Sequence, residues 1–250
     1  MNWDELYAGL LLERPASQAS LALVEAAEEL LIRHLGSEIR RPQPGFFEAL
    51  TAARHELKHG HLAPLCRNLL AEQGLPLEHL GIDELRLRGV APGSHLLEAA
   101  RPAFYAHRDT WYANPQAQIN LWIPLHRVDE RNGFAFYPEA FSRAVQNDSE
   151  GFDYDVFRHT GFQQPGGSLL AHYPRCLEEL DERPRPVRLE RGQLLWFSAA
   201  HLHQTLPNQS DRIRFSLDLR IVHRQHHQAG RGAPNCDNRS RGCALEDYRC

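Results

Sequence analysis

The sequence predicts a mainly β protein in which α-helices precede a β-rich core. Over the first third of the chain, hydrophobic residues recur at three- and four-residue spacing, which is the period of a helix. From about residue 84 they alternate with polar residues, which is the period of a strand. A chain of 250 residues with 42% hydrophobic content can bury a substantial core. We predict one domain over residues 1–250, made of a helical part (1–83), a β core (84–222) and a C-terminal tail (223–250).

Composition and charge narrow the class of protein. The net charge of −4 and the pI of about 6.4 argue against a nucleic-acid partner, whose binding surface would be basic. No apolar run approaches the roughly eighteen residues that a membrane span needs, and the N-terminus lacks the basic start of a secretory signal. We therefore expect a soluble cytoplasmic protein with a small-molecule ligand, reduced cysteines and no membrane partner. The sequence does not predict the oligomeric state.

Three helices are expected in the N-terminal part, at residues 17–35, 46–59 and 62–73. Gly36 and Gly74 stand where the first and third helices should end. The apolar side of these helices should pack on a sheet and form one wall of a pocket.

A histidine and a carboxylate stand two residues apart in the predicted strand at residues 103–112. In a strand, His107 and Asp109 project from the same face, about 7 Å apart, together with Tyr105 and Trp111. A second, distant histidine would complete the two-histidine, one-carboxylate set that holds non-haem Fe(II) and leaves three coordination positions open. The triplet alone is weak, because a chain with 15 histidines produces such spacings by chance.

The next strand, at residues 116–125, has unusual polarity. Its aliphatic positions should face the helices, while Gln118, Asn120 and Trp122 should face the interior with His107 and Asp109. The alternative is an edge strand whose polar side lies in water.

The second histidine is expected after a buried strand at residues 194–198, where His201 and His203 are both available. A turn at residues 207–211 then leads into a strand at residues 212–220. Arg214 and Ser216 share one face of that strand, and a guanidinium with a nearby hydroxyl is suited to bind a carboxylate. The alternative is that the arginines of this strand lie on the surface.

Residues 84–222 resemble the phytanoyl-CoA dioxygenase family of Fe(II)/2-oxoglutarate oxygenases. The resemblance consists of the His107-Arg108-Asp109 triplet, the Asn132-Gly133 turn, a glycine eleven residues before His203, and the motif that runs from His203 to Arg214. This register selects His203 over His201 as the ligand. The stretch from 107 to 124 and the tail further resemble the branch associated with streptomycin-type antibiotic biosynthesis.

The resemblance implies a double-stranded β-helix (jelly roll) fold and an enzyme that uses Fe(II), 2-oxoglutarate as cosubstrate and O2. Iron would be held by His107, Asp109 and His203. The far carboxylate of 2-oxoglutarate would bind Arg214 and Ser216, and Asn120 or Gln118 would bind the near one. The expected reaction is hydroxylation of a small molecule with release of succinate and CO2. Desaturation and epoxidation are alternatives, whereas related halogenases replace the carboxylate ligand with a small residue.

The expected substrate contacts are aromatic residues near the triad, namely Tyr105, Trp111, Tyr112 and Trp122, with the acidic and aromatic segment at residues 150–160. The role of the wider region at residues 140–175 is not predicted, and neither is the substrate.

Two other functions compete with this interpretation. A cupin-type metalloenzyme that does not use 2-oxoglutarate would need the triad but not Arg214, and a non-catalytic jelly-roll binding protein would need neither. The tail offers a separate hypothesis, in which it holds a zinc ion instead of serving as a flap over the barrel mouth. The residues of that hypothetical zinc site are His223, His226, His227, Cys236, Cys243 and Cys250.

Overall fold

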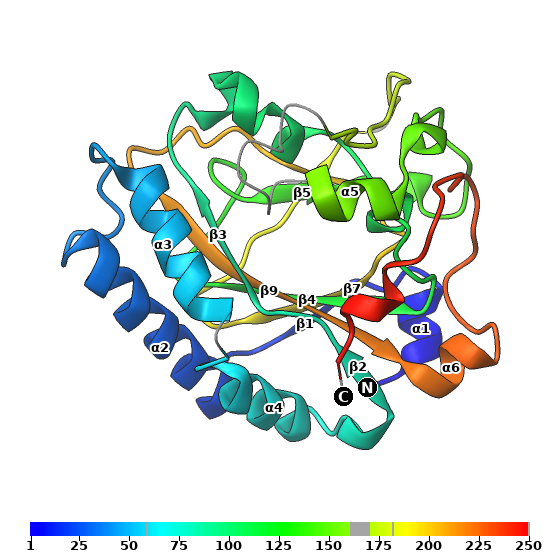
Figure 1. Ribbon diagram of the computed structural model, residues 1–250, viewed down its shortest axis with the longest axis horizontal. Coiled ribbons are helices and arrows are strands. Elements are labelled where there is room, and N and C mark those ends of the chain that lie inside the picture. Colours follow the sequence, from blue (N-terminus) through cyan, green and yellow to red (C-terminus); the bar gives the residue numbers. More distant parts are fainter. Residues whose placement is uncertain (59, 161–170, 182, 250) are drawn as a thin grey trace.

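A computed structural model describes residues 1–58, 60–160, 171–181 and 183–249. Two antiparallel β-sheets form the core, and helices flank them (Figure 1). The α-helices are α1 (Trp3–Tyr7), α2 (Gln18–Leu35), α3 (Phe46–Lys58), α4 (Ala63–Glu72), α5 (Tyr154–Thr160) and α6 (Arg224–Gln228). None of the helices that the structure describes has both the length and the hydropathy of a membrane-spanning segment.

The larger sheet has the strand order β1-β7-β4-β9-β2, and β3 also pairs with β9. Its strands are β1 (Leu12–Arg14), β2 (Leu80–Ile82), β3 (Arg86–Val90), β4 (Gln118–Pro124), β7 (Leu194–Ser198) and β9 (Arg214–His223). The smaller sheet has the order β6-β5-β8. It consists of β5 (Phe134–Phe136), β6 (Arg185–Pro186) and β8 (His203–Thr205).

Helices α2, α3 and α4 lie along one face of the larger sheet, as the sequence predicts (Figure 1). Helix α2 begins at Ser17, whose side chain accepts the backbone N–H of Ser20, and it ends at Gly36 with φ 78°. Its buried leucines join those of α3 and α4 in one cluster with the aliphatic residues of the sheet. That cluster includes Ile119, Leu121, Ile123 and Leu125 from β4 and its exit, and Phe215, Leu217 and Leu219 from β9.

The opposite face of the larger sheet is polar yet buried. Gln118 and Asn120 of β4, and Arg214 and Ser216 of β9, are each at most 5% exposed. Strand β4 lies between β7 and β9, so the alternative of an edge strand in water is wrong. Buried polar side chains need partners, which makes this interior face the place to look for a functional site.

The predicted strand at residues 103–112 is not formed. A 3₁₀ helix, η3 (Glu98–Phe104), precedes His107, and a second, η4 (Asp109–Tyr112), begins at Asp109. Pro102 cannot donate to a sheet, and Ala113 has φ 58°, so the chain turns on both sides of His107. Only His107 pairs, in an isolated bridge with His203. The prediction that Tyr105 and Trp111 share the face of His107 by alternation is therefore wrong.

The segment at residues 149–160 forms η6 (Ser149–Gly151) and α5, and the C-terminal tail lies against it. Phe152 and Tyr154 are buried there, and the Tyr154 hydroxyl donates to Asp247 Oδ1 at 2.5 Å. Within the region 140–175, whose role the sequence does not predict, residues 161–170 lie outside the described residues.

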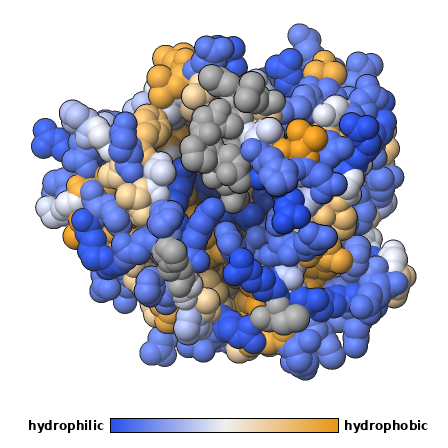
Figure 2. Space-filling model, in the orientation of Figure 1, coloured by the Kyte–Doolittle hydropathy of each residue, from blue (hydrophilic) through white to orange (hydrophobic). Residues whose placement is uncertain are grey.

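The face seen in Figure 2 is largely hydrophilic, and its hydrophobic side chains lie in small separate groups. This face therefore offers no continuous apolar patch of the kind that marks a large protein interface.

Candidate metal centre

His107, Asp109 and His203 meet in space. Each offers one donor atom, and the three atoms lie within 4.8 Å of one another. Among the residues that the structure describes, they form the one group of histidine, cysteine, aspartate or glutamate side chains that could hold a metal ion. The two histidines are joined by reciprocal backbone hydrogen bonds of 2.9 Å, and Asp109 follows at the start of η4. The three residues that the sequence selects do come together. The reason given for His107 and Asp109, alternation along one strand, is nevertheless wrong, because that strand is not formed.

Both histidines are oriented by backbone carbonyls. The Nδ1 atom of His107 lies 2.8 Å from the Tyr105 carbonyl oxygen, and Nδ1 of His203 lies 3.0 Å from that of His201. A carbonyl can only accept, so Nδ1 carries the proton in each ring and Nε2 keeps its lone pair. This second contact fixes the tautomer that a metal ligand requires.

The Asp109 carboxylate is held through one oxygen. Oδ2 accepts the side-chain N–H groups of Asn120 at 2.6 Å and Gln118 at 3.3 Å. Oδ1 lies 3.6 Å from His107 Nε2 and 3.5 Å from Arg220 Nη2. Oδ1 is thus the oxygen on the side of the histidines.

The charges in this site suit a divalent cation. Burial opposes ionisation of Asp109, but Arg220 and the two histidines together hold its pKa well below the usual value. Burial, with the neighbouring His107, lowers the pKa of His203 to about 4, so its imidazole is neutral at pH 7. Metal ions bind ionised carboxylates and neutral imidazoles, which are the states that the surroundings impose on Asp109 and His203 before any ion arrives.

Arg214 and Ser216 lie on the interior face of β9, as predicted. Arg214 is 3% exposed, and its Nη1 donates to Ser216 Oγ at 2.7 Å while Nε donates to the Asn132 carbonyl at 3.2 Å. Its guanidinium carbon lies 5.8 Å from the centre of the Trp122 ring. Burial lowers the pKa of Arg214 to about 10, so the side chain remains charged at pH 7. Within the described parts of the chain, no carboxylate forms an ion pair with it.

The two amides have another partner than the one expected. Gln118 and Asn120 do face the interior, but their N–H groups are hydrogen-bonded to Asp109. They therefore support the acidic member of the triad, and their contact with a cosubstrate stays a prediction.

Arg220 is a site residue that the sequence reading missed. It lies on the same face of β9 as Arg214 and Ser216, and burial opposes its charge while Asp109 and Asp83 raise its pKa overall. The same alternation that selected Arg214 would have placed it inside. The alternation is thus a usable signal, but the motif that selects Arg214 does not extend to residue 220.

The four aromatic residues expected to contact substrate lie in different places. The Tyr112 ring lies 5.4 Å from the His107 ring and packs on Phe152, and Trp122 packs on Phe134. Trp111 is fully buried and donates its indole N–H to Asp237 at 2.7 Å. It fills a core cluster that includes Leu202, so it is a packing residue with no surface for a ligand.

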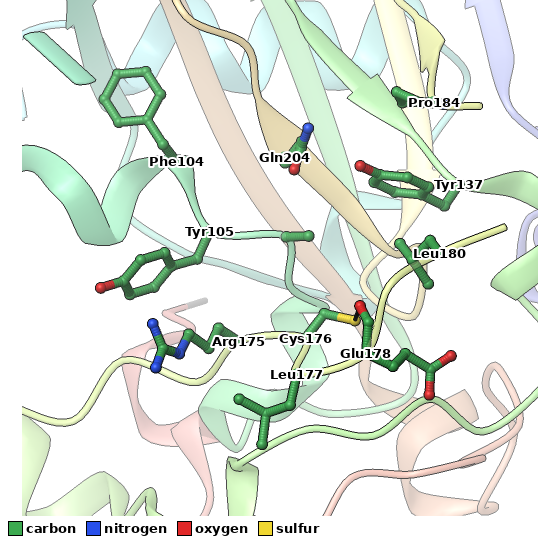
Figure 3. A pocket seen from close by; sticks show the side chains of 11 residues that line it. Phe104, Tyr105, Tyr137, Arg175, Cys176, Leu177, Glu178, Leu180, Pro184 and Gln204 are labelled. Atoms are coloured by element: carbon green, nitrogen blue, oxygen red, sulfur yellow. Dashed lines mark hydrogen bonds between the residues drawn. The ribbon is translucent and has the colours of Figure 1, made fainter. Parts of the chain in front are cut away.

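Tyr105 faces a different cavity. It lines a pocket of about 560 Å³ together with Tyr137, Arg175 and Gln204, and the Arg175 guanidinium lies 5.1 Å from the centre of the Tyr105 ring (Figure 3). Gln204 follows His203 in β8, so its side chain projects from the opposite face of that strand. The pocket therefore lies on the face of β8 opposite His203, and none of the three triad residues lines it.

Arg108, between the two ligands of the triplet, is a buried structural hub. It is 2% exposed and donates to Asp237 Oδ2 at 3.1 Å and to the carbonyls of Ala140 and Arg143 at 2.7 and 2.9 Å. A further bond reaches the carbonyl of Ala200, shortly before His203. The triplet, the loop after β5 and the tail are thus joined by one guanidinium.

Replacing Arg108 with methionine should destabilise the protein by about 3–5 kcal/mol, because it leaves the buried carboxylate of Asp237 without the cation that pairs with it. The matched control is Arg158→Met, which removes an exposed ion pair with Glu246 and should cost about 1 kcal/mol or less. Urea unfolding of the metal-free proteins measures both. Equal, small losses for the two variants would contradict the role of Arg108.

The zinc hypothesis for the tail finds no support in the described residues. His223 and His226 stack with ring centres 3.9 Å apart, and Trp3 packs against both. Cys236 and Cys243 are free thiols, and neither forms a three-ligand group with these histidines in the described chain. Cys250 lies outside the described residues.

Comparison with known proteins identifies a family whose matched residues include the triad. The family model of phytanoyl-CoA dioxygenase (PhyH) matches residues 55–216. No curated protein matches the sequence. Among solved structures, EvdO2 from Micromonospora carbonacea var. aurantiaca is 13% identical, with 88% of this chain and 89% of that chain covered and a TM-score of 0.50.

Two further solved structures are similar. EvdO2 complexed with 2-oxoglutarate is 14% identical, with the same coverage of 88% and 89% and a TM-score of 0.50. AviO1 from Streptomyces viridochromogenes Tue57 is 16% identical, with 88% and 95% covered and a TM-score of 0.43. At these identities the EvdO2 structures are evidence for the fold alone.

Proposed function

Because the chain belongs to the phytanoyl-CoA dioxygenase family, whose model matches residues 55–216, we propose that it is a non-haem Fe(II)- and 2-oxoglutarate-dependent oxygenase of a small molecule. Its two sheets would form the double-stranded β-helix core. The observation that carries the proposal is the pairing of a two-histidine, one-carboxylate group with a buried arginine that has no acidic partner among the described residues.

The triad fits iron by its chemistry. His107, Asp109 and His203 would hold the ion through Nε2, Oδ1 and Nε2, which are the donors that the surrounding hydrogen bonds leave open. Two imidazoles and one carboxylate are the ligand set of Fe(II) oxygenases, and zinc sites with the same ligands are the main competing chemistry. When bound, Fe(II) with 2-oxoglutarate and O2 supplies the oxidising power for an unactivated C–H bond.

Arg214 and Ser216 would bind the far carboxylate of 2-oxoglutarate. A buried guanidinium is costly unless a charge compensates it, and the carboxylate supplies that charge in a bidentate fork. Trp122 lies beside the guanidinium and also packs on Phe134, whose ring lies 6.1 Å from that of His203. This aromatic link connects the arginine to the triad and would keep water away from the cosubstrate.

Asp109 favours hydroxylation over halogenation. A small residue at this position would leave a coordination place for a halide, whereas the carboxylate fills it. Asn120 and Gln118 hold that carboxylate through Oδ2, and Arg220 lies 3.5 Å from Oδ1, so its orientation is restrained on both sides. The resemblance of residues 107–124 to the streptomycin-type branch supports a substrate from secondary metabolism, and an antibiotic precursor is the substrate class we propose.

A cupin-type enzyme that does not use 2-oxoglutarate is the second candidate. It would use the same triad but has no need for a buried cation on β9. The burial of Arg214, together with its positive charge at pH 7, therefore favours the 2-oxoglutarate enzyme.

Succinate release tests the proposed activity. The metal-free protein, supplied with Fe(II), 2-oxoglutarate, O2 and ascorbate, should form succinate and CO2 slowly without substrate, since ascorbate supplies the two electrons that reduce the second oxygen atom to water. Removing iron with a chelator should stop the reaction, and Zn²⁺ should not restore it. Failure to form succinate in the iron-loaded protein, with 2-oxoglutarate recovered intact, would reject the proposal.

A further inference from the structure

The C-terminal tail returns to the core of the protein and ends beside β2 (Figure 1). Arg249 exchanges two backbone hydrogen bonds of 2.9 Å with Ile82, and Arg224 Nη2 donates to the Tyr248 carbonyl at 3.2 Å. Tyr248, which directly precedes Arg249, is 5% exposed and belongs to the main hydrophobic cluster. The tail is therefore pinned in place, and its last tyrosine points inward.

The Tyr248 hydroxyl reaches the amide that supports the triad. Its oxygen lies 2.5 Å from Gln118 Oε1 and 3.4 Å from Asn114 Oδ1. Both neighbours are acceptors, so the hydroxyl donates, and the shorter contact receives the proton. Burial raises the pKa of Tyr248 well above its ordinary value, which keeps that proton in place at neutral pH.

The hydroxyl stabilises one orientation of the Gln118 amide. With Oε1 accepting from Tyr248, the amide nitrogen must point the other way, where it donates to Asn120 Oδ1 at 2.7 Å and Asp109 Oδ2 at 3.3 Å. Asn120 in turn directs its own nitrogen to Asp109 Oδ2 at 2.6 Å. The four side chains form one directed chain of hydrogen bonds.

The reverse orientation of Gln118 would be unfavourable. Turning the amide over would set Oε1 against two other acceptors, Asn120 Oδ1 and Asp109 Oδ2. It would also bring the amide nitrogen to the tyrosine oxygen. In a buried network each unmatched polar contact is costly. The favoured orientation is therefore the one in which Asp109 keeps two donors on Oδ2 and offers Oδ1 to an ion, and the Tyr248 hydroxyl stabilises it by donating to Gln118 Oε1.

We propose that Tyr248 is a positioning residue of the metal site, acting from the C-terminal tail through Gln118 and Asn120 on the Asp109 carboxylate. The proposal rests on the proposed function, because it requires that the triad binds a metal ion. It gives the tail a role that differs from both a zinc site and a flap over the barrel mouth.

Binding of Co²⁺ to the metal-free protein tests the proposal without turnover. Tyr248→Phe keeps the ring and removes only the hydroxyl, and it should weaken Co²⁺ binding by about tenfold, at the lower end of the effect of outer-shell partners. The visible ligand-field absorption of the bound Co²⁺ should also change, because the carboxylate is held less firmly.

The control is Tyr154→Phe. Tyr154 also donates its hydroxyl to the tail, at Asp247, but that contact does not lead to the triad. This variant should bind Co²⁺ like the unmodified protein and give the same absorption. If both variants lose affinity equally, the tail acts through general packing and the proposal fails.

A double-mutant cycle identifies the route. Gln118→Leu removes the amide but keeps bulk, and it should weaken Co²⁺ binding at least as much as Tyr248→Phe. Adding Tyr248→Phe to it should change nothing further. Additive losses would overturn the proposed route. Thermal melting of each metal-free variant establishes that it is folded, and Gln118→Leu carries the test if Tyr248→Phe does not fold.

The two proposals fail in different ways. If His203→Ala and the unmodified protein bind Co²⁺ equally, then the triad is not a metal site and the proposed function falls. If His203→Ala loses the ion but Tyr248→Phe binds it as tightly as the unmodified protein, then only the positioning role of Tyr248 is rejected.

Discussion

Replacing His203 with alanine should abolish iron binding at the triad and with it the formation of succinate from 2-oxoglutarate. The imidazole supplies one of three donors, and its Nε2 is the atom that the His201 carbonyl leaves open. Loss of an outer-shell partner typically costs 10–100-fold in affinity or activity, and loss of a direct ligand should exceed that range. Metal titration and succinate formation measure the two effects.

His201 provides the matched control, since it is the neighbouring histidine that the sequence also offers. Its ring is 1% exposed, and its two nitrogens lie 3.1 Å from the carbonyls of Ser198 and Gly9. His201→Gln should therefore lower the melting temperature but retain one bound ion per chain. Loss of the ion in His201→Gln with retention in His203→Ala would reverse the assignment.

Replacing Arg214 with methionine should raise the concentration of 2-oxoglutarate needed for turnover by at least about thirtyfold, since removing one partner of a buried charge pair costs about 2–5 kcal/mol. Arg214→Lys keeps a charge but loses the planar fork, and it should recover only part of the affinity. Metal affinity should be unchanged in both variants, because Arg214 makes no contact with the triad. Succinate formation against 2-oxoglutarate concentration is the measurement.

The stability of the same variant gives a second reading. Arg214 forms no ion pair among the described residues, so relief of its buried charge should largely offset the loss of its hydrogen bonds to Ser216 and Asn132, and the metal-free Arg214→Met protein should melt close to the unmodified protein. Arg212→Met is the control, because Arg212 is exposed and lies two residues before β9, and it should leave the 2-oxoglutarate requirement unchanged. If Arg214→Met also leaves that requirement unchanged, the cupin-type alternative is favoured.

Local pattern predicts the elements whose burial follows a simple period. Helices α2, α3 and α4 each have one apolar side, and β4 has one aliphatic and one polar side, so their positions and faces are confirmed. The family prediction is likewise confirmed by the match over residues 55–216. The domain boundaries and the roles of the site residues stay predictions.

The features that the sequence predicts wrongly, or does not predict, depend on contacts between distant parts of the chain. The segment around His107 alternates like a strand, yet Pro102 and the turn at Ala113 leave it one isolated bridge. Tyr248 lies 130 residues from Gln118, and no periodicity within either segment indicates that they meet. Arg108 looks like an exposed residue between two ligands, but the loop after β5 and the tail enclose it.

The most direct test of the account is an anaerobic titration of the metal-free protein, first with Fe(II) and then with 2-oxoglutarate, followed by visible absorption. A keto acid chelated to Fe(II) absorbs visible light by charge transfer, so the band reports both molecules at one site. We expect the band only when both are present, with one equivalent of each per chain, and we expect it to be lost in His203→Ala. A protein that binds Fe(II) but gives no band, or a band that persists in His203→Ala, would contradict the assignment of the triad as an iron and 2-oxoglutarate site.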